Sequence, residues 1–229
     1  MLILALETST EYGSCALWRD GAVLERICPP GRSHSETLLP LVRELLSEAG
    51  LKISELDAIA FGAGPGAFTG LRVACAAAQG LAVAANLPLI PVTSLEAMAF
   101  LAGGDRVLAL LDARMGEVYS GAYLRSDAGC MLQGDIRVAA PDAVALPAEP
   151  GWTACGNAIG AYPALQERLS AAGIAMLPDI LPSAAAVARL AAPRVVRGEG
   201  LDAALAAPLY IRDKVAKTVA ERLSEGGRA

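Results

Sequence analysis

Hydrophobic and polar positions along this chain change between a period of two and a period near 3.6, which predicts strands and helices in a regular order. Three short apolar runs come first, and Arg19-Asp20-Gly21 forms a hairpin turn between the second and the third. A helix, a strand, a long helix, a strand and a short helix are predicted next. In chain order, these eight elements cover residues 2–7, 14–19, 22–27, 34–49, 56–61, 69–86, 89–92 and 94–101.

The opening pattern returns in the second part of the chain. Glu7 and Asp112 close equivalent apolar runs 105 residues apart, and a second Arg-to-Gly turn begins at Arg125. Internal similarity of this kind predicts a duplicated α/β domain, in which two subdomains each hold a mixed sheet flanked by helices. The predicted boundary gives subdomains at residues 1–102 and 103–229. The repeated strands are predicted at residues 106–111, 117–124 and 130–138, and further helices at residues 183–192 and 213–224.

Two of the predicted helices have more apolar surface than one sheet can cover. In residues 34–49 the apolar positions span about 160°, whereas a helix on a sheet needs a stripe of about 100°. In residues 69–86 no charge follows Arg72, and Arg72, Gln79 and Asn86 recur every seven residues on one side. The two helices either cover each other within the subunit or present a joint outer face to another protein.

The second explanation predicts a protein interface built from both helices, in which alanine and glycine allow close contact. Leu45→Glu or Ala78→Arg is then expected to break association and to leave the subunit folded. The predicted interface residues are Leu38, Leu39, Val42, Leu45, Leu46, Gly70, Leu71, Ala74, Ala77, Ala78 and Leu81.

Composition narrows the class and the compartment. The chain has 19 basic and 24 acidic residues, a net charge of −5 and a pI near 5.0, whereas nucleic-acid-binding domains usually have a pI above about 9. Five scattered cysteines without a Cys-x-x-Cys motif indicate reduced thiols in a cytoplasmic protein. The first residues lack the basic start of a signal peptide, and the long uncharged stretch at residues 73–95 contains two prolines, so no membrane segment is expected.

The sequence offers little catalytic chemistry. His34 is the single histidine, which excludes a site with two histidine ligands, and no Gly-x-Ser-x-Gly motif is present. The glycine-rich segment at residues 62–70 fits neither dinucleotide-binding nor P-loop spacing. Its glycines provide either an anion site at a helix start or positive φ angles and close packing.

The first loop contains the candidate ligands for a cofactor. Thr8 and Ser9 are predicted to be the remains of a phosphate-binding loop, since the counterpart Asp112-Ala113-Arg114-Met115-Gly116 has no hydroxyl and carries bulky side chains. Glu7 and Asp112 either hold a metal through water or position a turn, and the second role is the commoner one. No catalytic residue and no metal ligand are predicted.

Four segments together resemble the bacterial TsaB (YeaZ-type) family, whose members are subunits of the tRNA threonylcarbamoyladenosine machinery. The resemblance covers essentially the whole chain, and the third segment is its most specific motif; Ala67 stands where the family usually has serine. The four segments are Leu6-Glu7-Thr8-Ser9, His34-Ser35-Glu36-Thr37-Leu38-Leu39-Pro40, Gly64-Pro65-Gly66-Ala67-Phe68-Thr69-Gly70-Leu71-Arg72 and Asp112-Ala113-Arg114-Met115-Gly116-Glu117-Val118-Tyr119.

The resemblance implies an actin-like ASKHA fold and a non-catalytic role. The implied function is to bind and activate the catalytic threonylcarbamoyltransferase paralogue, which forms N6-threonylcarbamoyladenosine next to the anticodon of tRNA. That relative binds its metal through a pair of histidines, which this chain lacks. The resemblance also implies contact through the two helices, a homodimer through the same face, tRNA contact only through the complex, and ATP used by an ATPase component instead of this chain.

Two other functions remain as alternatives. An ATP-dependent small-molecule phosphotransferase of the same fold would need both phosphate loops, and the altered loop at Asp112 disfavours it. A peptidase, the older label of the family, has no supporting residues in this sequence. Calorimetry with magnesium-ATP distinguishes the phosphotransferase from the accessory subunit.

Overall fold

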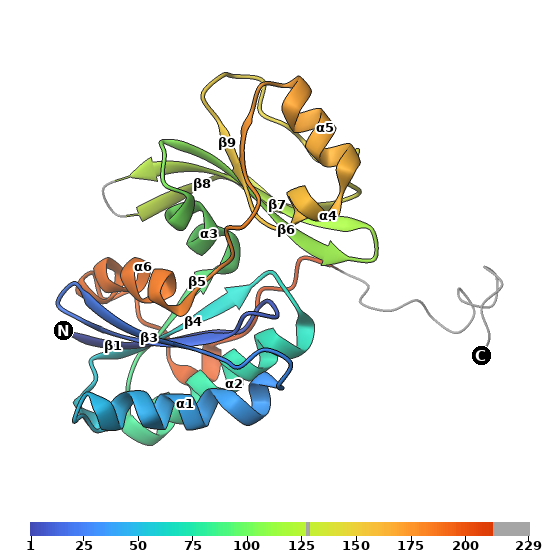
Figure 1. Cartoon of the computed structure of the whole chain (residues 1–229). Coiled ribbons are helices and arrows are strands. Elements are labelled where there is room, and N and C mark those ends of the chain that lie inside the picture. Colours follow the sequence, from blue (N-terminus) through green and yellow to red (C-terminus); the bar gives the residue numbers. More distant parts are fainter. Residues whose placement is uncertain (127–128, 213–229) are drawn as a thin grey trace.

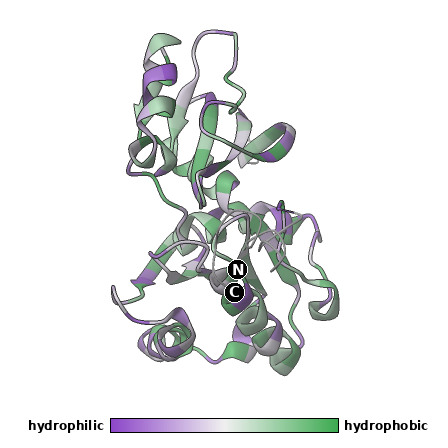
Figure 2. Ribbon diagram, turned by 90° about the vertical axis from the view of Figure 1, so that its right-hand side faces the viewer, coloured by the Kyte–Doolittle hydropathy of each residue, from purple (hydrophilic) through white to green (hydrophobic). Residues whose placement is uncertain are grey.

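A computed structural model describes residues 1–126 and 129–212 as two α/β halves placed one above the other (Figure 1). The helix predicted at residues 213–224 lies outside the described residues. Viewed after a quarter turn, the halves meet at a narrow waist (Figure 2). The strands of the first half are β1 (Leu2–Glu7), β2 (Ser14–Arg19), β3 (Ala22–Ile27), β4 (Ala58–Gly64) and β5 (Leu89–Thr93). Those of the second half are β6 (Arg106–Arg114), β7 (Glu117–Ser126), β8 (Gly129–Ala139), β9 (Thr153–Cys155) and β10 (Ala175–Leu177).

The two sheets have the same topology. The first has the order β3-β2-β1-β4-β5, and the second has the corresponding order β8-β7-β6-β9-β10. In each sheet the first three strands are antiparallel neighbours, and the last two run parallel to the first. The predicted duplication and the mixed sheets are therefore confirmed.

Helices cover both faces of each sheet, which explains why the central strands are continuous apolar runs. Alternate residues of a strand point to opposite faces. In β1, Leu4 and Leu6 pack with α1 and α2, whereas Ile3 and Ala5 pack with α6. The helices are α1 (His34–Glu48), α2 (Phe68–Ala85), α3 (Ser94–Ala102), α4 (Ala158–Ala161), α5 (Pro163–Ala171) and α6 (Ala184–Val196), with short 3₁₀ turns η1 (Ile53–Glu55) and η2 (Ala203–Leu205).

The two halves exchange their last helices. α3 follows the first sheet in sequence, but its Leu95, Met98 and Ala99 pack in the core of the second. α6 follows the second sheet, and its alanines and Val187 pack against the first. The predicted subdomain of residues 103–229 therefore needs correction, because α6 and η2 return to the first half. Strand and helix periodicity does not show which sheet a helix will cover.

Neither long helix has a side-chain N-cap, and only α2 begins at a different residue from the one predicted. Ser33 is the N-cap of α1, but its side chain makes no capping hydrogen bond, and the helix continues through Pro40. α2 begins at Phe68, one residue before the predicted start, with Ala67 as its N-cap. Because neither helix has a side-chain cap, packing of its apolar side against the sheet provides most of its stability.

Candidate functional site

The loops that follow β1 and β6 face each other across a cleft between the halves. The cavity there encloses about 210 Å³, which is below the roughly 300–1,000 Å³ of pockets that hold drug-sized ligands. Its residues come from both loops, from the start of α2 and from residues 209–212. We call residues 203–212 the C-terminal segment. The cavity residues include Ser9, Thr10, Gly66, Phe68, Asp112, Arg114, Met115, Tyr119, Asn157, Tyr210 and Arg212.

The acids that close β1 and β6 make the same turn. The Glu7 carboxylate accepts a hydrogen bond from the Ser9 backbone N–H at 2.5 Å, and the Asp112 carboxylate accepts one from the Arg114 backbone N–H at 2.8 Å. Each acid thus fixes the loop two residues further on. The predicted equivalence of Glu7 and Asp112 extends to single hydrogen bonds, and positioning a turn is the role the geometry supports.

Glu7 lies outside the cavity, in the core of the first half. It is fully buried, and a Cβ added at Gly62 would lie 1.9 Å from its Oε2, so only glycine fits beside it. Burial raises the pKa of Glu7, and hydrogen bonding from Ser9 offsets part of that rise. A buried carboxyl that does not line the cavity cannot act on a bound substrate.

The two candidate phosphate ligands have different positions. The buried Thr8 hydroxyl donates a hydrogen bond of 2.7 Å to the Gly70 carbonyl oxygen, so it ties β1 to α2 and is not free to bind a phosphate. Ser9 does line the cavity, and its buried Oγ has no hydrogen-bond partner within the described residues. Thr8 is therefore corrected to a structural residue, and Ser9 stays a prediction.

The second loop carries bulky side chains where a phosphate would need backbone access. Arg114 and Met115 adopt left-handed backbone angles, with φ of 60° and 56°, a conformation that residues other than glycine rarely adopt. Asp112 accepts a further hydrogen bond of 2.7 Å from the Tyr162 hydroxyl and pairs with Arg114 at 3.2 Å. This loop is fixed by Arg114 from within and by Tyr162 from outside it.

The single histidine and its neighbours also lack a catalytic arrangement. His34 Nε2 lies 2.8 Å from the Thr10 carbonyl oxygen, and burial raises the pKa of the nearby Cys28 thiol. A thiol held neutral in this way is a poor nucleophile. Among residues 1–126 and 129–212, no group of three or more His, Cys, Asp and Glu side chains is placed to hold a metal ion.

The structure corrects the predicted helix interface. Seven of its eleven residues are buried within their own half, so they are not available to a partner. Leu45 and Ala78 are both fully buried, and a charge at either would disrupt the core of the subunit instead of breaking association selectively. The buried residues are Leu38, Val42, Leu45, Gly70, Leu71, Ala74 and Ala78.

An apolar outer surface nevertheless remains. We define the α1–α2 face as the exposed or half-buried residues Leu39, Leu46, Ala76, Ala77, Gly80, Leu81, Val83 and Ala84. Val83 is 72% exposed, and a groove between the helices is lined by Leu39, Leu46 and Leu81. Sequence reasoning missed the four α2 residues other than Ala77 and Leu81, because periodicity gives no sign of which side of an apolar helix faces solvent.

By length and composition α2 would also be able to cross a membrane. One side of it, which includes Ala74 and Ala78, packs on the sheet instead, as in the core helix of a globular protein.

The polar stripe of α2 has a role that was not anticipated. The Gln79 side-chain amide donates hydrogen bonds of 2.9 and 3.0 Å to the carbonyl oxygens of Ala203 and Ala206, and Arg72 Nε donates one of 3.2 Å to the Tyr210 hydroxyl. The C-terminal segment of the chain therefore covers this side of α2. Among the residues that the structure describes, this leaves open the strip of α2 between that segment and α1.

The repeated topology and the paired loops define a duplicated α/β fold. A family model described as "TsaD: tRNA N6-adenosine threonylcarbamoyltransferase" matches residues 29–219. The chain is 37% identical to the tRNA threonylcarbamoyladenosine biosynthesis protein TsaB of Escherichia coli, over 94% of this chain and 96% of that protein. It is 35% identical to the TsaB of Haemophilus influenzae, over 94% and 95%.

A solved structure described as YeaZ from Pseudomonas aeruginosa is 41% identical to this chain. It superposes with a TM-score of 0.83 over 91% of this chain and 99% of that one. The chain belongs to the TsaB (YeaZ-type) family of proteins of tRNA threonylcarbamoyladenosine biosynthesis.

Proposed function

We propose that this chain is a non-catalytic subunit that binds and activates the threonylcarbamoyltransferase that forms N6-threonylcarbamoyladenosine next to the anticodon of tRNA. The observation that carries the proposal is the α1–α2 face. On α2 this face has no charge and consists of small or apolar residues, among them Ala76, Gly80 and Val83, which are exposed. Contiguous apolar surface of this kind is typical of a protein interface.

Small side chains on α2 favour a helix partner. The distance between two packed helix axes depends on the side chains at the contact, and alanine and glycine permit a close approach. Binding at this face would favour one conformation of the partner, because a ligand shifts an equilibrium by its difference in affinity for the two states. Activation of the transferase follows if the favoured conformation is the active one.

The remaining parts of the proposal concern cofactors and other partners. The cleft is small, and the bulky side chains of Arg114 and Met115 line it on the side of the β6–β7 loop. We therefore assign catalysis to the transferase and ATP use to an ATPase component of the complex, with no cofactor bound by this chain alone.

The net charge of −5 favours tRNA contact only through the complex. The complex would act in the cytoplasm, and the isolated chain would form a homodimer through the same face.

Val83→Glu tests the proposal, with Val196→Glu as a matched control. Val83 on α2 is 72% exposed and Val196 on α6 is 77% exposed, so neither substitution affects the core. Gel filtration with the purified transferase should show co-elution of the wild type and Val196→Glu and loss of co-elution of Val83→Glu. A modification assay with the complete set of components should fall in parallel, while circular dichroism shows a folded subunit.

Two results would reject the proposal. One is co-elution of Val83→Glu at the wild-type level, which would place the partner elsewhere. The other is full tRNA modification when this chain is omitted. Micromolar binding of magnesium-ATP by the isolated chain, together with turnover of an acceptor, would favour the phosphotransferase instead.

A further inference from the structure

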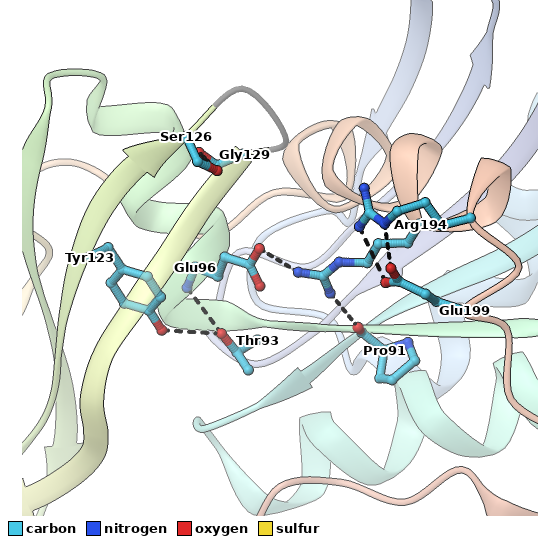
Figure 3. A network of polar contacts seen from close by, with 9 residues as sticks. Pro91, Thr93, Glu96, Tyr123, Ser126, Gly129, Arg194 and Glu199 are labelled. Carbon is cyan, nitrogen blue, oxygen red and sulfur yellow. Dashed lines mark hydrogen bonds and ion pairs between the residues drawn. The ribbon is translucent and has the colours of Figure 1, made fainter.

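The two halves are joined where α3 packs against α6, and we refer to this junction as the hinge. Arg194 on α6 donates a hydrogen bond of 2.8 Å to the Pro91 carbonyl oxygen and pairs with Glu96 on α3 at 2.5 Å (Figure 3). The Thr93 hydroxyl accepts a hydrogen bond from the Glu96 N–H at 3.2 Å and lies 3.3 Å from the Tyr123 hydroxyl (Figure 3). These contacts connect β5 of the first sheet to β7 of the second.

A separate crossing lies away from this hinge, where the chain leaves the first half after residue 208 (Figure 1). We call residues 209–212 the strap. Its first end is held by the first half: the Leu209 N–H donates a hydrogen bond of 2.7 Å to the Ala63 carbonyl oxygen. The Tyr210 ring lies 5.5 Å from the Phe68 ring, and Arg72 binds the Tyr210 hydroxyl.

The other end of the strap is held by the second half. The half-buried Ile211 packs in the core cluster that contains Tyr119. Arg212 donates a hydrogen bond of 3.2 Å to the Ala113 carbonyl oxygen and pairs with the Glu117 carboxylate. Hydrogen bonds to charged groups are among the strong ones in proteins. Four consecutive residues thus connect the start of α2 to the β6–β7 turn.

We propose that the strap holds the cleft between the halves closed. In two-lobed proteins that close around a ligand, the ligand provides contacts to both lobes. Here the chain provides them itself, and the strap residues Tyr210 and Arg212 also line the cavity. Rotation about the α3–α6 hinge would have to break the contacts at one end of the strap. The isolated chain should therefore stay closed without a ligand.

The distance between the halves tests this proposal. Spin labels on unnatural amino acids at the exposed positions Lys52 and Glu167 report on the first and the second half respectively. The wild type should give one narrow distance distribution, and Arg212→Ala and Tyr210→Ala should each add longer distances. Arg197→Ala is the control, because Arg197 forms an exposed ion pair with Glu199 outside the strap.

Amide hydrogen exchange gives a second readout that does not depend on the labels. The Leu209 amide should exchange about tenfold faster in Arg212→Ala than in the wild type, because loss of one anchor frees the strap. Other core amides should keep their protection, which excludes global unfolding. Unchanged distance distributions in both strap variants, or an unchanged Leu209 exchange rate, would overturn the proposal.

Discussion

The two halves of this protein share a sheet topology but differ in their loops and covering helices. In the first half, two long helices cover one face of the sheet, and the loop after β1 is compact enough for the Thr8 hydroxyl to reach α2. In the second half, short helices α4 and α5 and a proline-containing segment at residues 140–152 take the corresponding place. Strand order is thus the same in two halves whose loops and covering helices differ, because register depends on many residues and a loop on few.

The equivalent acids Glu7 and Asp112 also combine a shared backbone geometry with different surroundings. Glu7 and Asp112 each accept the backbone N–H two residues ahead. Asp112 is also held by the Tyr162 hydroxyl and the Arg114 guanidinium, whereas Glu7 Oε2 has no hydrogen-bond partner in the described part of the chain. The same turn thus occurs in two different electrostatic environments.

Gly70→Ala should have the largest effect on this comparison. A Cβ at Gly70 would lie 1.8 Å from the Thr8 carbonyl oxygen, so α2 would have to move away from β1. We expect a loss of more than about 3 kcal/mol in the free energy of unfolding, since backbone cannot move aside as a side chain does. Urea denaturation measures it.

The matched control is Gly160→Ala in α4, the helix at the corresponding place in the second half. Nothing lies within 4 Å of a Cβ at Gly160, so the variant should change stability by less than about 1 kcal/mol. Equal losses in both variants would show that the close contact between helix and loop is not special to the first half.

Glu7→Gln should flatten the dependence of stability on pH. Because burial raises the pKa of Glu7 in the folded state, its contribution to stability is complete below its ordinary value near 4.5 and is lost as the pH rises through the raised value. Glutamine does not titrate, so the variant should gain stability relative to the wild type at pH 8 and not at pH 4. Thermal unfolding across this range provides the measurement.

Glu36→Gln is the control for this variant, because Glu36 is an exposed carboxylate of α1 that pairs with Arg32 only at 3.8 Å. It should leave the pH profile unchanged. A wild-type profile that Glu7→Gln reproduces at every pH would contradict the assigned cost of ionising Glu7.

Tyr162→Phe should cost less, about 1–2 kcal/mol, because it removes the hydrogen bond to the Asp112 carboxylate. Tyr12→Phe, at an exposed tyrosine of the first half, should cost nothing measurable. Chemical denaturation of both variants compares them. Equal stabilities would mean that the Asp112 turn, like that of Glu7, needs no side-chain partner.

The smallest effect concerns Tyr162 itself and leaves the fold unchanged. Burial, together with the hydrogen bond and the charge of Asp112, raises the pKa of Tyr162 to about 12. Asp112→Asn should lower it toward the ordinary value near 10, since the negative charge is removed. An NMR titration of the labelled tyrosine ring measures the shift, and a pKa that stays near 12 would show that Asp112 does not raise it.

Much of the architecture was predictable from local patterns. The apolar runs predicted the strands of the first half and β6, β7 and β8 of the second, and the repeat that joins Glu7 to Asp112 predicted the duplication. The short strand β10 was not predicted. The candidate interface was less predictable. Leu45 and Val83 are both apolar positions on long helices, yet one is fully buried and the other is 72% exposed. Hydropathy is a property of a residue, whereas burial depends on what packs against it.

The sequence by itself determined the element order, the internal repeat, the family resemblance and the scarcity of catalytic side chains, because each of these is a property of residues near one another in the chain. Only the tertiary structure decided that α3 and α6 exchange halves, that Gln79 and Arg72 bind the C-terminal segment, and that residues 209–212 cross the cleft. The hydrogen bonds of Gln79, Arg72 and Arg212 join residues 99 or more positions apart. The partners of these residues, like those of α3 and α6, are chosen by packing that no local pattern records.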